Sequence, residues 1–314
     1  MKILFTSAGR RVELMQAFHS ASVNSGIPLE LFGADMNPNA PALAFCDRSV
    51  IVPAIRSEDY IPELKRICRE EEIDAVIPTI DTDLLILARE RERFHPTKVI
   101  ISDPEKDALC RDKRLTAEYL LSVGLKSPVP VDSILDYRGG FPAFIKPRDG
   151  SSSIFAYKAD SPEELESYSN RVPDYIIQPY IEGTEYTVDI FCDLEGNPVY
   201  ITPRIRLAVR SGEVLQTKID QDDRIIGEML SLAADYRPRG AITVQLIREN
   251  GTGEDWYIEI NPRFGGGAPL SIKAGADSAE ALLRILNGET TSYRGKAAED
   301  GAVYSRFDQS IRVQ

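Results

Sequence analysis

The sequence predicts an α/β protein in two parts, an open parallel sheet at the N-terminus followed by an α+β region. The first hundred residues alternate short apolar runs with helix-like segments, which is typical of a doubly wound sheet. After about residue 103 the alternation stops, and apolar strands lead into polar turns. We therefore expect one unit over residues 1–103 and a second over 104–314, with a lid lobe at about 115–180 and a C-terminal lobe at about 181–314.

The first unit contains five apolar runs that we interpret as strands. They are 2-KILFTS, 29-LELFGAD, 49-SVIVPA, 73-IDAVIPTI and 98-KVIIS, with helical patterns between them. Ligands of such sheets bind at the carboxyl ends of the strands. The polar residues at these ends make Arg10, Arg11, Asp81 and Asp83 candidate substrate-binding residues, although Asp in such places is also typical of turns and caps.

Composition argues against several classes of function. The 49 acidic and 37 basic residues give a formal charge of -12, which disfavours binding to nucleic acid or to an anionic membrane. The segment 7-SAGRRVEL has one glycine where a dinucleotide site needs G-x-G-x-x-G, so NAD(P)-dependent oxidoreduction is disfavoured too. The start 1-MKILFTSAG has no basic leader, and no long apolar stretch follows, so we expect a cytoplasmic protein.

The sequence offers few histidines and cysteines that could bind a metal or act as nucleophiles. The chain has 2 histidines and 4 cysteines, and the cysteines lack the paired C-x2-C spacing of zinc sites. We interpret them as reduced cysteines that pack in the interior.

The second unit begins with a helical pattern and then offers a candidate phosphate site. Apolar spacing predicts a helix over 103–123, ended by Gly124. Further on, the strand 141-FPAFIKP carries Lys146 directly to a turn with Gly150, Ser151 and Ser152. Backbone N–H groups in such a turn can approach an anion closely, and the ammonium group adds charge. A plain hairpin turn gives the same pattern.

Residues 241–263 read as a β-hairpin that presents oxygen ligands on one face. If residues 250–254 form the loop, Gln245 lies opposite Glu259, and Thr243 lies opposite Asn261. Period-two alternation places Tyr257, Glu259 and Asn261 on one face and Trp256, Ile258 and Ile260 on the other. Oxygen donors without imidazole or thiolate suit Mg²⁺, with Mn²⁺ as the alternative. A solvent-facing polar stripe has the same alternation.

These pieces, and above all 259-EINPR, resemble the ATP-grasp superfamily. More narrowly, residues 1 to about 290 resemble one synthetase half of the carbamoyl phosphate synthase large subunit, with its Rossmann-like pre-ATP-grasp domain. The resemblance implies ATP and Mg²⁺ as cofactors, with Gln245, Glu259 and Asn261 as metal ligands. It also implies a nucleotide site formed by Lys113, Lys146, Ser151, Ser152, Gln178, Tyr180, Ile181 and Glu185.

The resemblance further implies that Arg263 faces the acceptor carboxylate and the transferred phosphoryl group. Arg210 falls where the synthase has a histidine, and with Arg204 and Arg206 it forms a set that either neutralises an anion or makes a solvated strand face. The catalytic candidates are Arg263, Arg210 and Lys146. The following 265-GGG is expected to let the chain turn beside a ligand.

The resulting hypothesis is an ATP- and Mg²⁺-dependent, ADP-forming carboxylate-amine ligase that works through an acyl phosphate. Phosphoryl transfer needs positioning and charge neutralisation more than a strong base, so two histidines are no obstacle. The expected partners are a small carboxylate, such as an amino acid, and an amine; whether the chain forms a homodimer stays open. The main alternative is an ATP-binding sensor or scaffold without turnover.

Overall fold

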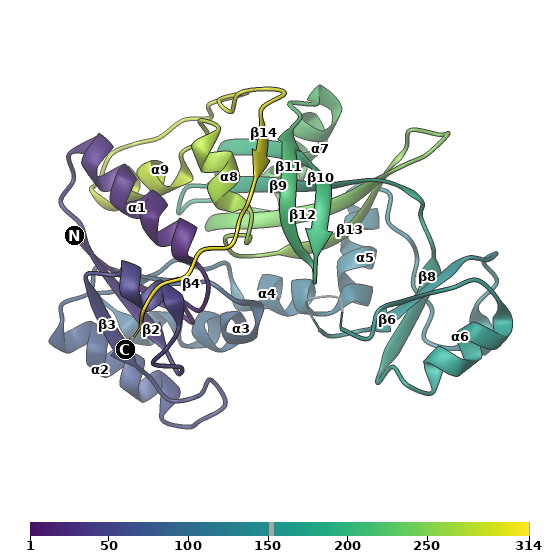
Figure 1. Cartoon of the computed structure of the whole chain (residues 1–314), viewed down its shortest axis with the longest axis horizontal. Helices are drawn as coiled ribbons and strands as arrows, with labels where there is room; N and C mark the ends of the chain where they lie inside the picture. The colour runs from purple at the N-terminus through teal and green to yellow at the C-terminus, as the bar shows by residue number, and fades with distance from the viewer. Residues whose placement is uncertain (151–153, 314) are drawn as a thin grey trace.

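The computed structural model describes residues 1–150 and 154–313, which form three sheets surrounded by helices (Figure 1). The first sheet lies in the N-terminal part, a small sheet projects to the right in this view, and a six-stranded sheet occupies the top. The α/β and α+β prediction is confirmed. The predicted limits of the units at 103, 115 and 180 stay a prediction, although no sheet crosses them.

The first sheet is parallel, with the strand order β3-β2-β1-β4-β5. Its strands are β1 (Lys2–Thr6), β2 (Glu30–Asp35), β3 (Arg48–Ile51), β4 (Ala75–Pro78) and β5 (Lys98–Val99). The connecting helices are α1 (Val12–Ser25), η1 (Pro41–Phe45), α2 (Tyr60–Glu70), α3 (Asp81–Glu90) and η2 (Arg91–Phe94). The chain passes to opposite sides of β1, first to β2 and later to β4, so a crevice opens beyond the carboxyl ends of β1 and β4.

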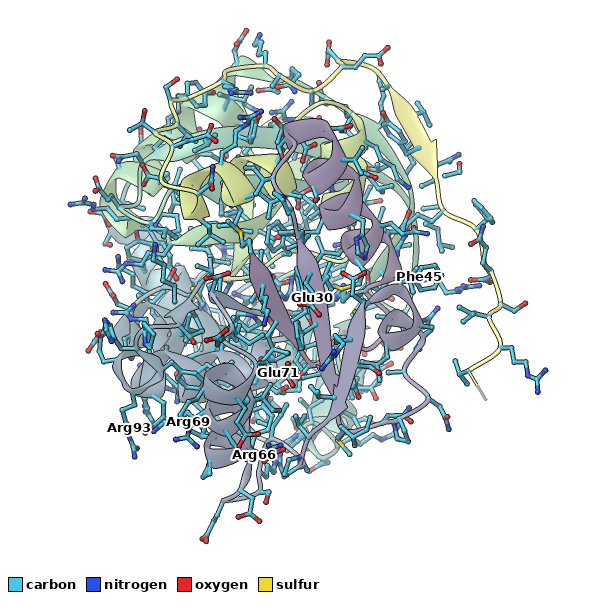
Figure 2. The ribbon with its side chains drawn as sticks, turned by 90° about the vertical axis from the view of Figure 1, so that its left-hand side faces the viewer. Glu30, Phe45, Arg66, Arg69, Glu71 and Arg93 are labelled. Carbon is cyan, nitrogen blue, oxygen red and sulfur yellow. The ribbon has the colours of Figure 1, made fainter. Side chains whose placement is uncertain are left out.

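The outer face of this unit carries charged helices that lie away from the crevice. Figure 2 shows Arg66, Arg69 and Arg93 near one another, and they line one shallow groove between α2 and α3. Arg66 is ion-paired with Glu63 on its own helix, and Arg93 with Glu90. Such exposed pairs contribute little to stability, so these charges mainly keep the outer face solvated.

The predicted helix over residues 103–123 is wrong in one respect, because the structure has two helices there. They are α4 (Pro104–Arg111) and α5 (Lys113–Ser122). Asp112 has extended backbone angles, and its side chain accepts hydrogen bonds from the N–H groups of Arg114 and Leu115. This N-cap starts a new helix axis, which places Lys113 at the first position of α5.

The small sheet forms a lobe with a core of its own. Its strands are antiparallel in the order β7-β6-β8, with β6 (Ala143–Pro147), β7 (Tyr157–Ala159), β8 (Tyr175–Pro179), η3 (Ile134–Asp136) and α6 (Pro162–Ser169). Ile145, Leu165 and Ile177 belong to a hydrophobic cluster that the rest of the chain does not share. This lobe therefore has its own packing, separate from the two larger sheets.

The six-stranded sheet is antiparallel, in the order β13-β12-β9-β10-β11-β14. Its elements are β9 (Gly183–Cys192), β10 (Pro198–Arg210), β11 (Glu213–Ile219), α7 (Asp223–Tyr236), β12 (Gly240–Glu249), β13 (Asp255–Asn261), α8 (Ala268–Lys273), α9 (Ser278–Leu286) and β14 (Val303–Ser305). In Figure 1, α1 of the first unit lies beside α8 and α9, and all three helices contribute to one hydrophobic cluster. This shared core fixes the crevice of the first sheet relative to the hairpin β12–β13.

The two predicted pairs of that hairpin are present, whereas the pairs nearer the loop are shifted by one residue and one face assignment is wrong. Gln245 pairs with Glu259, and Thr243 pairs with Asn261. A β-bulge follows, so Leu246 pairs with Tyr257, and Ile258 is the extra residue. Tyr257 consequently packs in the core with Leu246 and does not share the face of Glu259.

No helix within residues 1–150 or 154–313 is long and apolar enough to cross a membrane. All four cysteines have free thiols, which agrees with the prediction for them. Burial raises the pKa of Cys68 and Cys192 to about 12, as expected for thiols that pack in an apolar interior.

Candidate functional site

The predicted metal ligands lie together on one face of the hairpin β12–β13. Asn261 Nδ2 donates a hydrogen bond of 2.9 Å to Glu259 Oε1, and Glu259 is the cross-strand neighbour of Gln245. Asn261 Oδ1 and the second carboxylate oxygen of Glu259 can thus both face a cation. Arg206 Nη1 donates to Gln245 Oε1 at 2.8 Å, so this amide oxygen already has a partner.

This donor set fits a magnesium ion that is bound mainly through phosphates. In the described residues no group of three or more His, Cys, Asp or Glu side chains is placed to hold a metal by itself. Mg²⁺ in nucleotide sites takes one or two carboxylates from the protein and its other ligands from phosphate and water. Glu259 suits that role directly, while the side-chain oxygens of Asn261 and Gln245 have to exchange Arg263 and Arg206 for the ion.

Two lysines from different elements lie close to Glu259. Lys146 is carried by β6 and is 6% exposed, and Lys113 starts α5. Lys113 Nζ donates a hydrogen bond of 2.7 Å to the Gly150 carbonyl, and the backbone N–H of Lys113 donates to the Arg148 carbonyl. These two bonds connect α5 to the turn after β6. Burial lowers the pKa of both lysines, and the nearby Glu259 carboxylate partly opposes this. Strand β6 of the small lobe and the start of α5 therefore present two ammonium groups towards the hairpin.

We expect the affinity for Mg²⁺-ATP to fall with rising pH because of Lys146. Burial lowers the pKa of Lys146 to about 8, so the free protein loses this positive charge above that pH. The dissociation constant of a non-hydrolysable ATP analogue, measured by calorimetry, should rise roughly tenfold between pH 7 and 9. Lys146→Arg keeps its charge throughout and should give a flat profile; equal pH dependence in both proteins would contradict the assignment.

The rest of the predicted nucleotide site is only partly placed. Gln178 is buried, and its Nε2 donates to the Pro128 carbonyl at 2.6 Å, while Tyr180 is at the surface and its N–H donates to the Pro142 carbonyl. Ile181 follows at the end of the lid lobe, and Glu185 is half-exposed, 3.5 Å from Arg206. Ser151 and Ser152 lie outside the described residues. Roles in adenine, ribose and phosphate binding stay predictions.

Arg263 joins the hairpin to the crevice of the first sheet. Its Nη2 lies 2.8 Å from Asp81 Oδ2, at the start of α3, and 3.4 Å from Asn261 Oδ1. Arg11, from the turn after β1, donates to the Thr79 carbonyl at 3.2 Å, and burial together with the nearby Arg263 lowers its pKa. The crevice predicted from the strand ends and the hairpin therefore form one site.

The other crevice candidates have structural roles. Asp83 is fully buried, and its Oδ2 accepts hydrogen bonds from Thr6, Ser7 and Tyr60, so it braces the ends of the strands. Burial raises the pKa of Asp83 to about 6. Arg10 is exposed. At the end of β2, Asp35 accepts a hydrogen bond from the backbone N–H of Gly9 and so holds the turn after β1.

The three arginines of β10 have three different environments. Arg204 is 2% exposed and paired with Asp189 at 2.8 Å, Arg206 contacts Gln245 and Glu185, and Arg210 is exposed and paired with Asp308. Within the described residues no contact joins Arg210 to Glu259, Lys146 or Arg263, so its catalytic role stays a prediction without support from the geometry. Of this set, Arg206 contacts Gln245, one of the predicted metal ligands.

The glycines after Arg263 accommodate side chains of the protein itself. A Cβ on Gly267 would lie 2.5 Å from Arg204 Nη2, and one on Gly266 would lie 2.0 Å from Glu213 Oε2. The expected close approach is therefore real, but its partners are an arginine and a glutamate of the chain. The loop after β13 is consequently packed on charged groups.

We expect Asp189→Ala to lower the free energy of unfolding by about 3–5 kcal/mol, because it leaves the Arg204 charge buried without its partner. Asp189 Oδ2 accepts from Arg204 Nε and from Ser271 Oγ, and both contacts would be lost. Urea unfolding followed by circular dichroism measures the change. The control is Asp308→Ala, which removes an exposed ion pair and should cost less than about 1 kcal/mol; equal effects would contradict the account.

Comparison with known proteins supports a family for this arrangement. Residues 3–101 match the family described as "PylC-like, N-terminal domain", and residues 171–307 match "ATP-grasp in the biosynthetic pathway with Ter operon". A 3-methyl-D-ornithine–L-lysine ligase of Methanosarcina acetivorans is 24% identical over 87% of this chain and 71% of its own. These matches support the assignment to the ATP-grasp superfamily.

Solved structures show the same ATP-grasp fold over nearly the whole chain. The biotin carboxylase domain of the 2-oxoglutarate carboxylase of Hydrogenobacter thermophilus, in complex with MgADP and bicarbonate, has a TM-score of 0.79 at 16% identity and covers 96% of this chain and 73% of that one. An L-amino acid ligase from Bacillus licheniformis has a TM-score of 0.73 at 18% identity, with 94% and 77% covered. The prediction of an ATP-grasp ligase is confirmed, while the narrower resemblance to carbamoyl phosphate synthase stays a prediction.

Sequence reasoning missed two partners of the site. Arg206 was one of three similar arginines, and its contact with Gln245 depends on the pairing of β10, β9 and β12. Glu213, which lies beside Arg11 and Gly266, was not considered at all. Its only signal in the sequence is its position just after 211-SG, where a hairpin turn brings it back towards β10.

Proposed function

We propose that the protein joins a small carboxylate to an amine, with Mg²⁺-ATP as the energy source and an acyl phosphate as the intermediate. The observation that carries the proposal is the polar face of the hairpin: Lys113 and Lys146 lie near the Glu259 carboxylate, and Arg263 Nη2 lies 3.4 Å from Asn261 Oδ1 beside it. Two ammonium groups and a guanidinium next to an oxygen-ligand face are the parts that phosphoryl transfer requires.

In the first step, a carboxylate oxygen of the acid attacks the γ-phosphorus of ATP, and the bond from this phosphorus to the bridging oxygen of ADP breaks. Lys113 and Lys146 hold the phosphates from the side of β6 and α5. Arg263, kept in place by Asp81, binds the incoming carboxylate and stabilises the charge of the transferred group. Mg²⁺ bound at Glu259 and Asn261 would neutralise charge on the phosphate oxygens.

In the second step, the nitrogen of the amine attacks the acyl carbon, the bond to the phosphate oxygen breaks, and the nitrogen loses a proton. The partial burial of Arg263, whose side chain is 13% exposed, limits the access of water to the intermediate. A strong general base is not needed, because phosphate is a good leaving group. The ligase names of relatives such as the lysine ligase and the L-amino acid ligase support this reaction class.

The test is a screen of amino acids and simple carboxylic acids for stimulated ADP release, with hydroxylamine present to trap an acyl phosphate. We expect at least one acid to stimulate ADP release and to give a hydroxamate in equal amount. If ADP is released with an acid but no hydroxamate forms, the acyl phosphate is refuted. If no acid stimulates ADP release, the ligase proposal itself fails.

A further inference from the structure

The part of the site where the acid substrate would bind, around Arg263 and Arg11, carries more positive charge than one carboxylate needs. Arg263 and Arg11 are both largely buried, with side chains 13% and 18% exposed, and burial together with the nearby Arg263 lowers the pKa of Arg11. Arg263 has a tight counter-ion, Asp81, at 2.8 Å. Arg11 has a loose one, because its Nη1 lies 3.6 Å from Glu213 Oε1, beyond hydrogen-bond distance for a well-formed pair.

The Glu213 side chain is placed so that its carboxylate can move away from Arg11. It stands at the tip of the β10–β11 hairpin, after a turn in which Ser211 and Gly212 both have positive φ, and its side chain is 55% exposed. Its second contact, to Arg306 Nη1, is also long at 3.7 Å. An exposed group with two long contacts loses little when an anion from a ligand replaces it.

The other charged side chains near Arg11 and Glu213 already have close ion-pair partners. Arg306 Nε is 2.9 Å from Glu13, and Glu13 is also 2.8 Å from Lys273. Arg11 is therefore the cation of this group whose counter-ion is not firmly bound. The absence of a side chain at Gly266 leaves space for Arg11 and Glu213, because a Cβ there would lie 2.0 Å from Glu213 Oε2 and 2.7 Å from Arg11 Nη1.

Building on the proposed function, we propose that the acid substrate carries a second anionic group and that Arg11 binds it. Glu213 occupies this position while the site is empty and swings out when the acid arrives. Arg263 then binds the carboxylate that is activated, and Arg11 binds the second carboxylate or a phosphate of the same molecule. The substrate class is a dianionic acid, such as a dicarboxylate or an acidic amino acid.

The experiment compares pairs of acids that differ in one anionic group. Succinate is paired with butyrate, glutarate with pentanoate, and L-glutamate with L-glutamine, and ADP release is measured at saturating Mg²⁺-ATP. The wild-type KM should be at least about tenfold lower for the dianionic member of a pair. Arg11→Gln should raise that KM roughly 10- to 100-fold with a smaller change in kcat, which removes the difference within the pair.

Two further variants separate a specificity role from a structural one. Glu213→Gln keeps the shape but removes the competing charge, so we expect the KM for the dianionic acid to fall by a factor of about 3–10. Arg69→Gln removes an exposed charge on the outer face of the first unit, away from the crevice, and should change nothing. If Arg11→Gln does not fold, as judged by its melting curve, Arg11→Lys and Glu213→Gln still test the proposal.

The outcomes distinguish this inference from the proposed function. If acids stimulate ADP release but the preference within each pair is absent, or is the same in Arg11→Gln, the second anion site is refuted and the ligase stands. If Glu213→Gln raises the KM as Arg11→Gln does, Glu213 supports the site and is not a stand-in for substrate. If Mg²⁺-ATP binds but no acid stimulates ADP release, both the ligase proposal and this inference fail.

Discussion

Glu259→Gln should lower kcat/KM for acid-dependent ADP release by about 10³-fold, the size of effect seen when one preorganised group at a developing charge is removed. Glu259 is the carboxylate of the proposed metal site, and its neighbours Gln245 and Asn261 are uncharged amides. The substitution keeps the size of the side chain and its hydrogen bond to Asn261, so the hairpin should fold. What it removes is the negative charge that attracts a divalent cation.

The measurement is steady-state ADP release over a range of Mg²⁺ concentrations. The Mg²⁺ concentration for half-maximal activity should rise along with the loss of rate, which separates a metal ligand from a residue that only supports the fold. Glu254→Gln is the matched control, since Glu254 is 43% exposed in the loop at the other end of the hairpin and pairs with Lys126. Full activity of Glu259→Gln, with an unchanged Mg²⁺ requirement, would refute the ligase mechanism.

The hairpin β12–β13 shows which features of the site can be predicted from the sequence and which cannot. The alternation places Gln245 and Glu259 on the same face, but next to the loop Arg248 pairs with Asp255, one residue away from the predicted register, and the bulge restores the pairing of Gln245 with Glu259. The bulge at Ile258 was not predictable, because an apolar residue continues the alternation and gives no sign of being an insertion. The wrong face for Tyr257 follows from that one extra residue.

Contacts between units are the part of the site that sequence patterns do not encode. Asp81 and Arg263 are 182 positions apart, and what brings them together is the packing of α1 on α8 and α9. Local patterns placed both residues at the ends of strands, and only the three-dimensional core showed that these ends meet. Arg210 differs from Arg204 and Arg206 for a similar reason, since the register shifts between Arg206 and Val209 lie between them.

Arg263→Lys should lower kcat by about 10²–10³-fold while the affinity for Mg²⁺-ATP changes little. A guanidinium can bind two oxygens in one plane, whereas an ammonium is a point charge, so this substitution is not conservative at a bidentate site. Arg263 spans from Asp81 to Asn261, which leaves it between the metal ligands and the crevice where the acid would bind. A group in that place stabilises the charge of the transferred phosphoryl group more in the transition state than before it.

Single-turnover ADP formation with the best acid separates the effect on chemistry from the effect on binding. Arg263→Ala should lose still more activity, and added guanidinium chloride at low millimolar concentration should restore part of it, which a structural defect would not allow. Arg224→Lys is the control, because Arg224 is half-exposed at the far side of the sheet, where it pairs with Asp255. If Arg263→Lys raises the KM for the acid and leaves kcat unchanged, Arg263 only binds the substrate, and the stabilisation of the transferred group must come from Lys113 and Lys146.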